Sequence, residues 1–212
     1  MKKTICWLAV FAILFVPSLS GKAAQSVLDI KAGTFNPKDA KAGLLIGIST
    51  GKQVDERVDF GIGMDLFVRQ FTQETAIEAE IGGQSQSQLV QKEIDYSLFA
   101  LPLMLRLNFY ILPDLAFTPY VGLGGGYEIL FSREANYITG EKDSRLYGGF
   151  GWQAWGGVQY QLGSNSALIA EVLYNGCTVK RGKGSSDLGF PVHEELDFSG
   201  LGFRAGVRLG GF

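Results

Sequence analysis

The segment 57–71 constrains the fold of this chain more than any other stretch. Between positions 58 and 68 every even residue is apolar: Val58, Phe60, Ile62, Met64, Leu66 and Val68. The odd positions of the segment include Asp59, Gly61, Gly63, Asp65 and Arg69. Because successive side chains of a strand point to opposite faces, the period of two predicts a strand with one apolar and one polar face. About ten tilted residues of this kind cross the hydrocarbon core of a bilayer.

The same alternation recurs in seven further segments. They cover residues 28–34, 43–51, 99–109, 117–131, 146–162, 167–178 and about 197–212. The connections after the second, fourth and sixth segments are short. Those after the third, fifth and seventh are longer, and we expect the polar stretches 72–93 and 181–195 to be loops. Short turns on one side, long loops on the other and an even number of strands are typical of a transmembrane β-barrel.

Pro102 interrupts the fourth segment. Proline has no backbone N–H, so a strand that is paired on both sides cannot use it as a donor. We therefore expect a bulge or a missing ladder bond at this position.

The amino terminus predicts export from the cytoplasm. Lys2 and Lys3 precede an apolar run over residues 5–16, which Pro17 and small residues follow. This order is typical of a secretory signal peptide, and we expect cleavage near residue 23. The domains would then be a signal peptide, 1–23, and a barrel domain, 24–212. The run is too short to span a membrane as a helix, although an uncleaved anchor is the alternative.

Charge and cysteine content exclude several function classes. Without residues 1–23 the chain keeps 16 of its 19 basic residues and all 21 acidic ones, a net charge of −5. A nucleic-acid binder would instead carry a basic patch. Cys177 is the one cysteine left after cleavage, so we expect no internal disulfide and no metal centre. No motif for a cofactor is found.

The two faces of the predicted strands differ in chemistry. One face is mostly glycine with scattered ions, and its polar set would line a narrow lumen: Lys31, Asp59, Asp65, Arg69, Arg106, Glu128, Glu171, Arg204 and Arg208. Five basic and four acidic groups are nearly balanced, as enclosed ions must be. The other face is bulky and apolar and would meet lipid: Phe60, Ile62, Met64, Leu66, Leu101, Leu103, Leu105, Leu123, Tyr127, Trp152, Phe203 and Val207. The strands of a soluble barrel also alternate between apolar and polar residues. However, a soluble protein that exposed an apolar band of this size would aggregate in water.

These features predict an all-β fold, an eight-stranded antiparallel up-and-down transmembrane β-barrel in a bacterial outer membrane. The glycine-rich and aromatic stretch 120–127 and the terminal Phe212 resemble the small outer-membrane barrels, the family of OmpA transmembrane domains, OmpX and opacity proteins. The resemblance implies that the barrel-assembly machinery reads Phe212 during insertion. Phe212 is even, whereas the apolar residues from Leu201 to Leu209 are odd, and a bulge at Gly210 and Gly211 would restore the parity. The other partners implied are outer-membrane lipid, lipopolysaccharide and an unidentified extracellular ligand.

An eight-stranded barrel has an interior that side chains just fill. We therefore expect a membrane anchor that displays loops for adhesion or partner binding, with a plugged polar lumen. A small-solute or gated channel is one alternative, and a lipid A-modifying enzyme is another. His193 is the one histidine, with Ser185, Ser186, Glu194 and Glu195 nearby, but it lacks the His-x-Ser spacing of the lipid A deacylases. We expect no catalytic residues and no enzyme activity.

Overall fold

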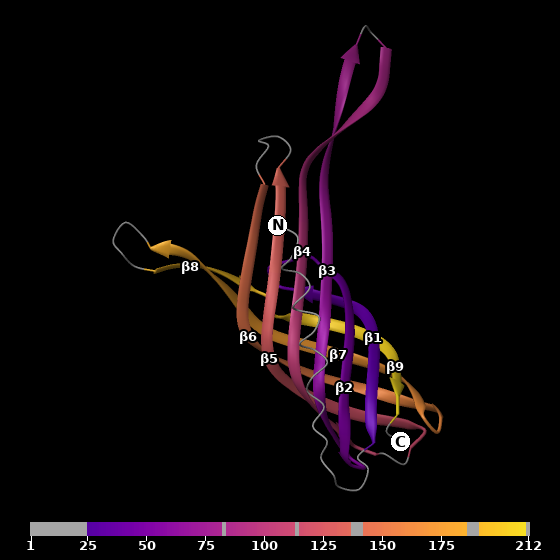
Figure 1. Ribbon diagram of the computed structural model, residues 1–212. Coiled ribbons are helices and arrows are strands. Elements are labelled where there is room, and N and C mark those ends of the chain that lie inside the picture. Colours follow the sequence, from indigo (N-terminus) through magenta and orange to yellow (C-terminus); the bar gives the residue numbers. More distant parts are fainter. Residues whose placement is uncertain (1–24, 82–83, 113–114, 137–141, 186–190, 211–212) are drawn as a thin grey trace, which may run out of the picture.

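The computed structural model describes residues 25–81, 84–112, 115–136, 142–185 and 191–210. Within these ranges the chain forms strands that pair antiparallel with one another (Figure 1). Their bounds are β1 (Ser26–Pro37), β2 (Gly43–Asp55), β3 (Val58–Ile81), β4 (Gln84–Tyr110), β5 (Phe117–Asn136), β6 (Lys142–Gly163), β7 (Ser166–Ser185), β8 (Pro191–Asp197) and β9 (Gly200–Leu209). No helix in the described ranges is long and apolar enough to cross a membrane.

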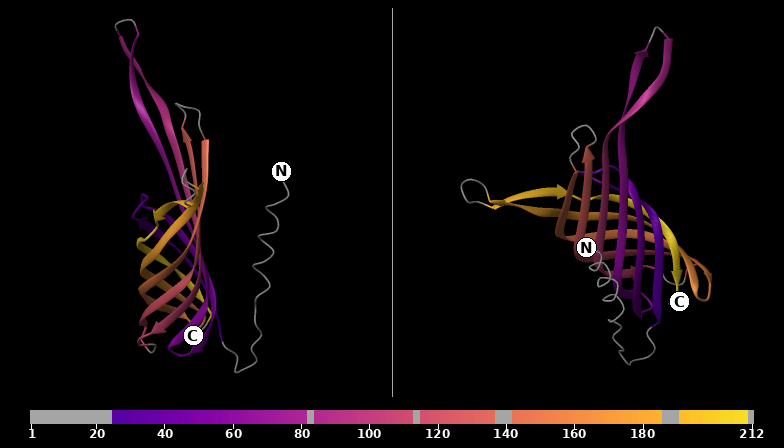
Figure 2. Two further views of the ribbon diagram at one scale, coloured as in Figure 1. Left: turned by 90° about the vertical axis from the view of Figure 1, so that its left-hand side faces the viewer. Right: turned by 45° about the horizontal axis from the view of Figure 1, so that its top comes forward.

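Eight of these strands close into a ring, as the alternation predicts. The order around the ring is β1-β2-β3-β4-β5-β6-β7-β9, and β9 pairs with β1 to complete it. The strands are tilted around the barrel axis (Figure 2). The period of two appears directly in the burial of β9, whose residues alternate between buried and exposed along most of the strand. The fold class expected from the sequence is therefore confirmed.

β8 lies outside the ring. Thr178 to Ser185 of β7 pair with β8, whereas Ser166 to Asn175 of the same strand pair with β9. The β7–β8 hairpin thus continues the β7–β9 pairing past the barrel wall, and it bends away from β6 (Figure 1). We call the end of the barrel that carries the β3–β4, β5–β6 and β7–β8 hairpins the hairpin end, and the opposite end the short-turn end.

Both long polar stretches expected to be loops contain strand instead. β3 and β4 remain paired up to Ile81 and Gln84, so most of 72–93 is a hairpin that projects far from the ring (Figure 1). β7 reaches Ser185 and β8 begins at Pro191, so 181–195 is also largely strand. The expectation was wrong because it relied on apolar alternation. Both stretches pair through their backbone ladders, which do not depend on an apolar face.

The ladder between β3 and β4 is interrupted next to Pro102, as expected for a residue without a backbone N–H. The pairing of β3 with β4 runs from Val58↔Phe109 to Met64↔Leu103 and resumes at Phe67↔Ala100 in the same register. The interruption is therefore a gap in the ladder and not a bulge. On its other side Pro102 remains opposite Glu128 of β5.

Candidate functional site

The barrel interior holds an ionic layer centred on Arg204 of β9. This side chain is fully buried, and its guanidinium contacts two carboxylates on strands far apart in the sequence. Arg204 Nη1 lies 3.0 Å from Asp65 Oδ2 on β3, and Arg204 Nε lies 2.5 Å from Glu171 Oε2 on β7. Charges removed from water in this way are stable only when paired and hydrogen-bonded, and Arg204 links two of the enclosed carboxylates.

Glu171 is the most connected acid of this layer. Its Oε1 accepts a hydrogen bond from Lys31 Nζ at 2.6 Å and one from the Tyr120 hydroxyl at 2.7 Å. Arg106 Nη2 lies 3.8 Å from the same oxygen. The Arg106 guanidinium also stacks on the Trp155 ring, 4.1 Å from its centroid, where the ring's quadrupole favours a cation.

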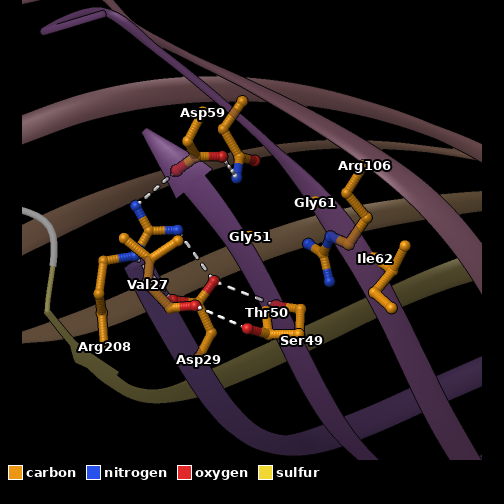
Figure 3. Close-up of a pocket in the computed structure, with 11 residues that line it drawn as sticks. Val27, Asp29, Ser49, Thr50, Gly51, Asp59, Gly61, Ile62, Arg106 and Arg208 are labelled. Carbon is orange, nitrogen blue, oxygen red and sulfur yellow. Dashed lines mark hydrogen bonds and ion pairs between the residues drawn. The ribbon is translucent and has the colours of Figure 1, made fainter. Parts of the chain in front are cut away.

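A second ionic group lies nearer the short-turn end, around Arg208 (Figure 3). Arg208 donates to Asp29 through Nε at 2.7 Å and through Nη2 at 2.9 Å, and to Asp59 through Nη1 at 2.8 Å. Asp59 also accepts hydrogen bonds from Asn108 and Tyr110, each at 2.6 Å. The cavity lined by Arg208, Asp29, Asp59 and their neighbours has a volume of only about 10 Å³. That volume holds about one water molecule.

The hairpin end of the interior is apolar. Phe35, Phe67 and Phe198 pack edge to face, with ring centroids 5.2 to 5.7 Å apart. Aliphatic side chains with at most 3% exposure surround them: Leu45, Leu98, Leu130, Leu173 and Val179. We call these eight residues the apolar plug. The apolar plug lies across the lumen, between the ionic layer and the hairpin end.

Glu128 occupies the boundary between the ionic layer and the apolar plug. Its carboxylate is completely buried, and it accepts a hydrogen bond from Asn175 Nδ2 at 3.3 Å. Gly151 leaves room for it, because a Cβ atom there would lie 2.4 Å from Glu128 Oε1. Cys177 borders the same space and is free and buried.

The connection between β1 and β2 is fastened to the junction of β8 and β9 at the hairpin end. The Asp39 amide donates to the Asp197 carbonyl at 3.2 Å, and the Asp197 amide donates to Asp39 Oδ2 at 2.7 Å. Lys38 Nζ lies 3.1 Å from Asp197 Oδ2. Hydrogen bonds from Ser199, together with Lys38, hold the pKa of Asp197 below its usual range. These contacts seat Phe198 in the apolar plug.

The structure brings together most of the polar residues predicted to line the lumen. Eight of them lie inside the barrel with at most 4% exposure: Lys31, Asp59, Asp65, Arg106, Glu128, Glu171, Arg204 and Arg208. Arg69 lies beyond Phe67 at the hairpin end and is half-buried, apart from the ionic layer. The sequence argument missed Asp29, although Asp29 has the same parity as Lys31 and pairs in register with Arg208. It also missed the apolar plug.

The residues predicted to face lipid lie on the outside of the barrel. Eleven of them have exposures between 38% and 61%, and Leu101 is intermediate. Aromatic pairs stand among them, including Tyr127 with Phe150 at 5.1 Å and Phe117 with Tyr160 at 4.7 Å between ring centroids. The first pair lies toward the hairpin end and the second toward the short-turn end. This arrangement is typical of the two aromatic girdles of a membrane barrel.

Comparison with known proteins decides the family. The model of the outer membrane protein beta-barrel domain matches residues 8–208. The chain belongs to this family. Membership implies that this barrel lies in a bacterial outer membrane, and its exposed apolar outer wall suits a lipid environment.

Solved structures show the same fold at low sequence identity. The outer membrane protein OprG from Pseudomonas aeruginosa is 16% identical, with a TM-score of 0.54 over 90% of this chain and 97% of that one. A major outer membrane protein from Thermus thermophilus is 11% identical, with a TM-score of 0.53 over 88% of this chain and 99% of that one. No curated protein sequence matches this barrel.

Several expectations lie outside the described residues or stay untested. The signal peptide at 1–23 and the assembly signal Phe212 fall in ranges that the structure does not describe. His193 belongs to the backbone of β8, opposite Gly182, but its side chain is not described. In the described part of the chain, no three His, Cys, Asp or Glu residues are grouped to hold a metal ion. The absence of a metal, a cofactor and catalytic residues therefore stays a prediction.

Proposed function

We propose that this barrel is a non-enzymatic membrane anchor that displays its long hairpins at the cell surface for adhesion or partner binding. The observation that carries the proposal is the combination of a filled interior with a hairpin that extends far beyond the apolar wall. The short-turn end faces the periplasm and the hairpin end faces outward, because outer-membrane barrels have short periplasmic turns and longer outer loops.

The β3–β4 hairpin supports the display role. The apolar outer face of β3 ends near Val68, but the strand continues to Ile81. At about 3.3 Å per residue, the part of β3 after Val68 extends the hairpin roughly 40 Å past the lipid-facing band. A two-stranded ladder of this length, which pairs only with itself beyond the ring of strands, suits the display of a binding surface.

The interior supports a plugged lumen. Any solute crossing it would have to displace the apolar plug and then part the ion pairs around Arg204 and Arg208. The plug packs fully buried side chains against one another, and separating them costs the burial free energy of several large side chains. The small cavity near Arg208 accommodates water and nothing larger.

Conductance in planar bilayers tests the plug. The purified barrel should leave the bilayer current at its baseline, while a general porin reconstituted in the same way gives discrete steps. Regular single-channel openings from the purified protein would overturn the plugged lumen and favour the channel function.

Surface attachment tests the display role. Gln73 and Ile94 are register partners, so replacing residues 74–93 by Asn-Gly would close β3 and β4 with a two-residue turn. Gram-negative cells that express the full chain or this shortened chain are compared for cell–cell aggregation and for attachment to protein- and glycan-coated surfaces. We expect the shortened chain to lose attachment while its surface expression is unchanged. Equal attachment by both chains would remove the long hairpin from the proposed function.

A further inference from the structure

One acidic side chain inside the barrel has no basic partner. The buried charged side chains of the described residues comprise four bases and five acids: Lys31, Arg106, Arg204 and Arg208, and Asp29, Asp59, Asp65, Glu128 and Glu171. Each of these acids except Glu128 forms an ion pair with an arginine. With every group ionised, the set would carry a net charge of −1, and Glu128 is the acid that remains unmatched.

The groups that face Glu128 from the surrounding strands add no positive charge. Its side chain is fully buried, and its register partners are Pro102 on β4 and Gly149 on β6. Cys177 of β7 borders the same space with its thiol. Asp65 of β3 acts on Glu128 electrostatically and, as an acid, opposes a second negative charge. An ionised carboxylate without a cation is very costly in such surroundings.

The polar atoms around Glu128 are short of hydrogen-bond donors. Three buried oxygens in the described structure accept no hydrogen bond: Glu128 Oε1, Gln153 Oε1 and Asn175 Oδ1. Gln153 and Asn175 are register partners on β6 and β7, so their side chains are neighbours on the inner face. The orientation of the Asn175 amide is fixed, because its Nδ2 donates to the Phe198 carbonyl at 3.1 Å. Gln153 Nε2 likewise donates to Asp65 Oδ2 at 3.4 Å. A carboxylate adds only acceptors to this group, whereas a carboxylic acid brings one O–H donor.

We propose that the folded barrel binds one proton at Glu128 and holds this side chain as a neutral carboxylic acid at neutral pH. The proton removes the unmatched charge at the border of the apolar plug, where an isolated ion is least stable. It also supplies the missing donor. Asn175 Nδ2 already donates to Glu128 Oε2 at 3.3 Å, and the Glu128 O–H can donate in return to Asn175 Oδ1. The inference concerns the interior alone and does not rest on the display function.

Infrared spectroscopy of the barrel in lipid vesicles at neutral pH tests the protonation state directly. Ordinary carboxyl groups are ionised at this pH, so the carbonyl band of a protonated carboxyl identifies an enclosed one. We expect the band in the wild type and its loss in Glu128→Gln. The matched control is Glu134→Gln, the same substitution at a glutamate of β5 that is 39% exposed, and it should keep the band. Identical spectra for the wild type and Glu128→Gln would overturn the proposal.

Unfolding by urea across a pH series gives an independent measurement. The unfolded chain ionises Glu128 above about pH 4.3, while the folded wild type keeps the proton. Unfolding therefore releases a proton, and rising pH favours the unfolded wild type. The unfolding equilibrium constant of the wild type, divided by that of Glu128→Gln, should rise up to about tenfold per pH unit between roughly pH 5 and 7. The ratio of Glu134→Gln to Glu128→Gln should rise in the same way. A ratio that stays flat would contradict proton binding.

A bound metal ion is the other way to balance the charge of Glu128. Elemental analysis of the barrel, after exchange into buffer free of Na⁺, K⁺ and divalent cations, should find no stoichiometric metal. One metal ion per wild-type barrel that is absent from Glu128→Gln would assign the compensating charge to the metal and overturn the proton. Heat-dependent gel migration establishes that each variant is folded, and the wild-type carboxyl band can be measured without any variant.

Discussion

At the scale of single residues, Arg204 is the side chain whose loss should cost most. Arg204→Met leaves Asp65 and Glu171 in the interior without their shared partner. Breaking a buried ion pair from one side costs about 3–5 kcal/mol of the free energy of unfolding. Urea unfolding in lipid vesicles, followed by tryptophan fluorescence, measures the loss. Arg133→Met, at an exposed position of β5, is the control and should stay within about 0.5 kcal/mol of the wild type. A loss below about 1 kcal/mol for Arg204→Met would contradict the ionic layer.

Two glycines of β5 offer a second test at this scale. A Cβ atom at Gly122 would lie 2.2 Å from the Trp155 ring, whereas one at Gly125 would meet nothing within 4 Å. The Trp155 indole cannot move away freely, because its N–H donates to Asn108 Oδ1 at 2.7 Å and Arg106 stacks on it. Gly122→Ala should therefore lower the free energy of unfolding by about 1–3 kcal/mol, as overpacking does. Gly125→Ala should have little effect in the same urea titration, and equal losses would mean that Trp155 has room to shift.

At the scale of strands and hairpins, the β3–β4 hairpin should be separable from the barrel. The chain with residues 74–93 replaced by Asn-Gly keeps all the lumen residues and all the lipid-facing residues named above. We expect it to retain heat-dependent gel migration and nearly the same urea midpoint as the full chain. A barrel that no longer inserts or folds would show that the hairpin is needed for stability, and the display role would lose its basis.

The same scale shows where the sequence argument succeeded and where it stopped. Alternation located the strands inside the membrane band, because lipid on one side and a lumen on the other demand opposite chemistry on the two faces. Outside the lipid-facing band the two faces of a strand need not differ in chemistry. The alternation of apolar and polar residues therefore could not reveal the paired ends of β3, β4, β7 and β8. Pro102 was predictable from its chemistry alone, since the missing donor acts wherever the strand lies.

The apolar plug shows a different limit. Leu45, Phe67 and Leu130 each have the parity of the glycine-rich face, so a signal was present in the sequence. Leu45 and Phe67 are register partners on the consecutive strands β2 and β3, and Leu130 lies level with them only because of the register of β4 with β3 and β5. Phe198 adds a further difficulty, because it lies between β8 and β9 and follows no alternation. The register of the strands and the closure of the barrel bring these side chains into one layer, and neither could be predicted from the sequence pattern.

At the scale of the whole molecule, Cys177 reports on the integrity of the barrel. Its side chain is 3% exposed at the inner wall of β7, so a maleimide reagent reaches it only when the barrel opens. We expect labelling of the folded protein in detergent to be slow and to rise with the fraction unfolded across a urea series. Thr178→Cys, one residue further and facing outward, is the control and should be labelled without denaturant. Rapid labelling of Cys177 in the folded protein would show that the wall between β6 and β7 opens readily.

The pairing of β1 with β9 has a consequence for how the molecule comes into being. Asp29 and Arg208 are 179 positions apart in the chain, yet they share two hydrogen bonds across that seam. Such a contact cannot form before β9 is present, because its second member lies on that strand. Until β9 pairs with β1, any sheet formed by the other strands has two unpaired edges, and such edges need protection from other chains until they meet.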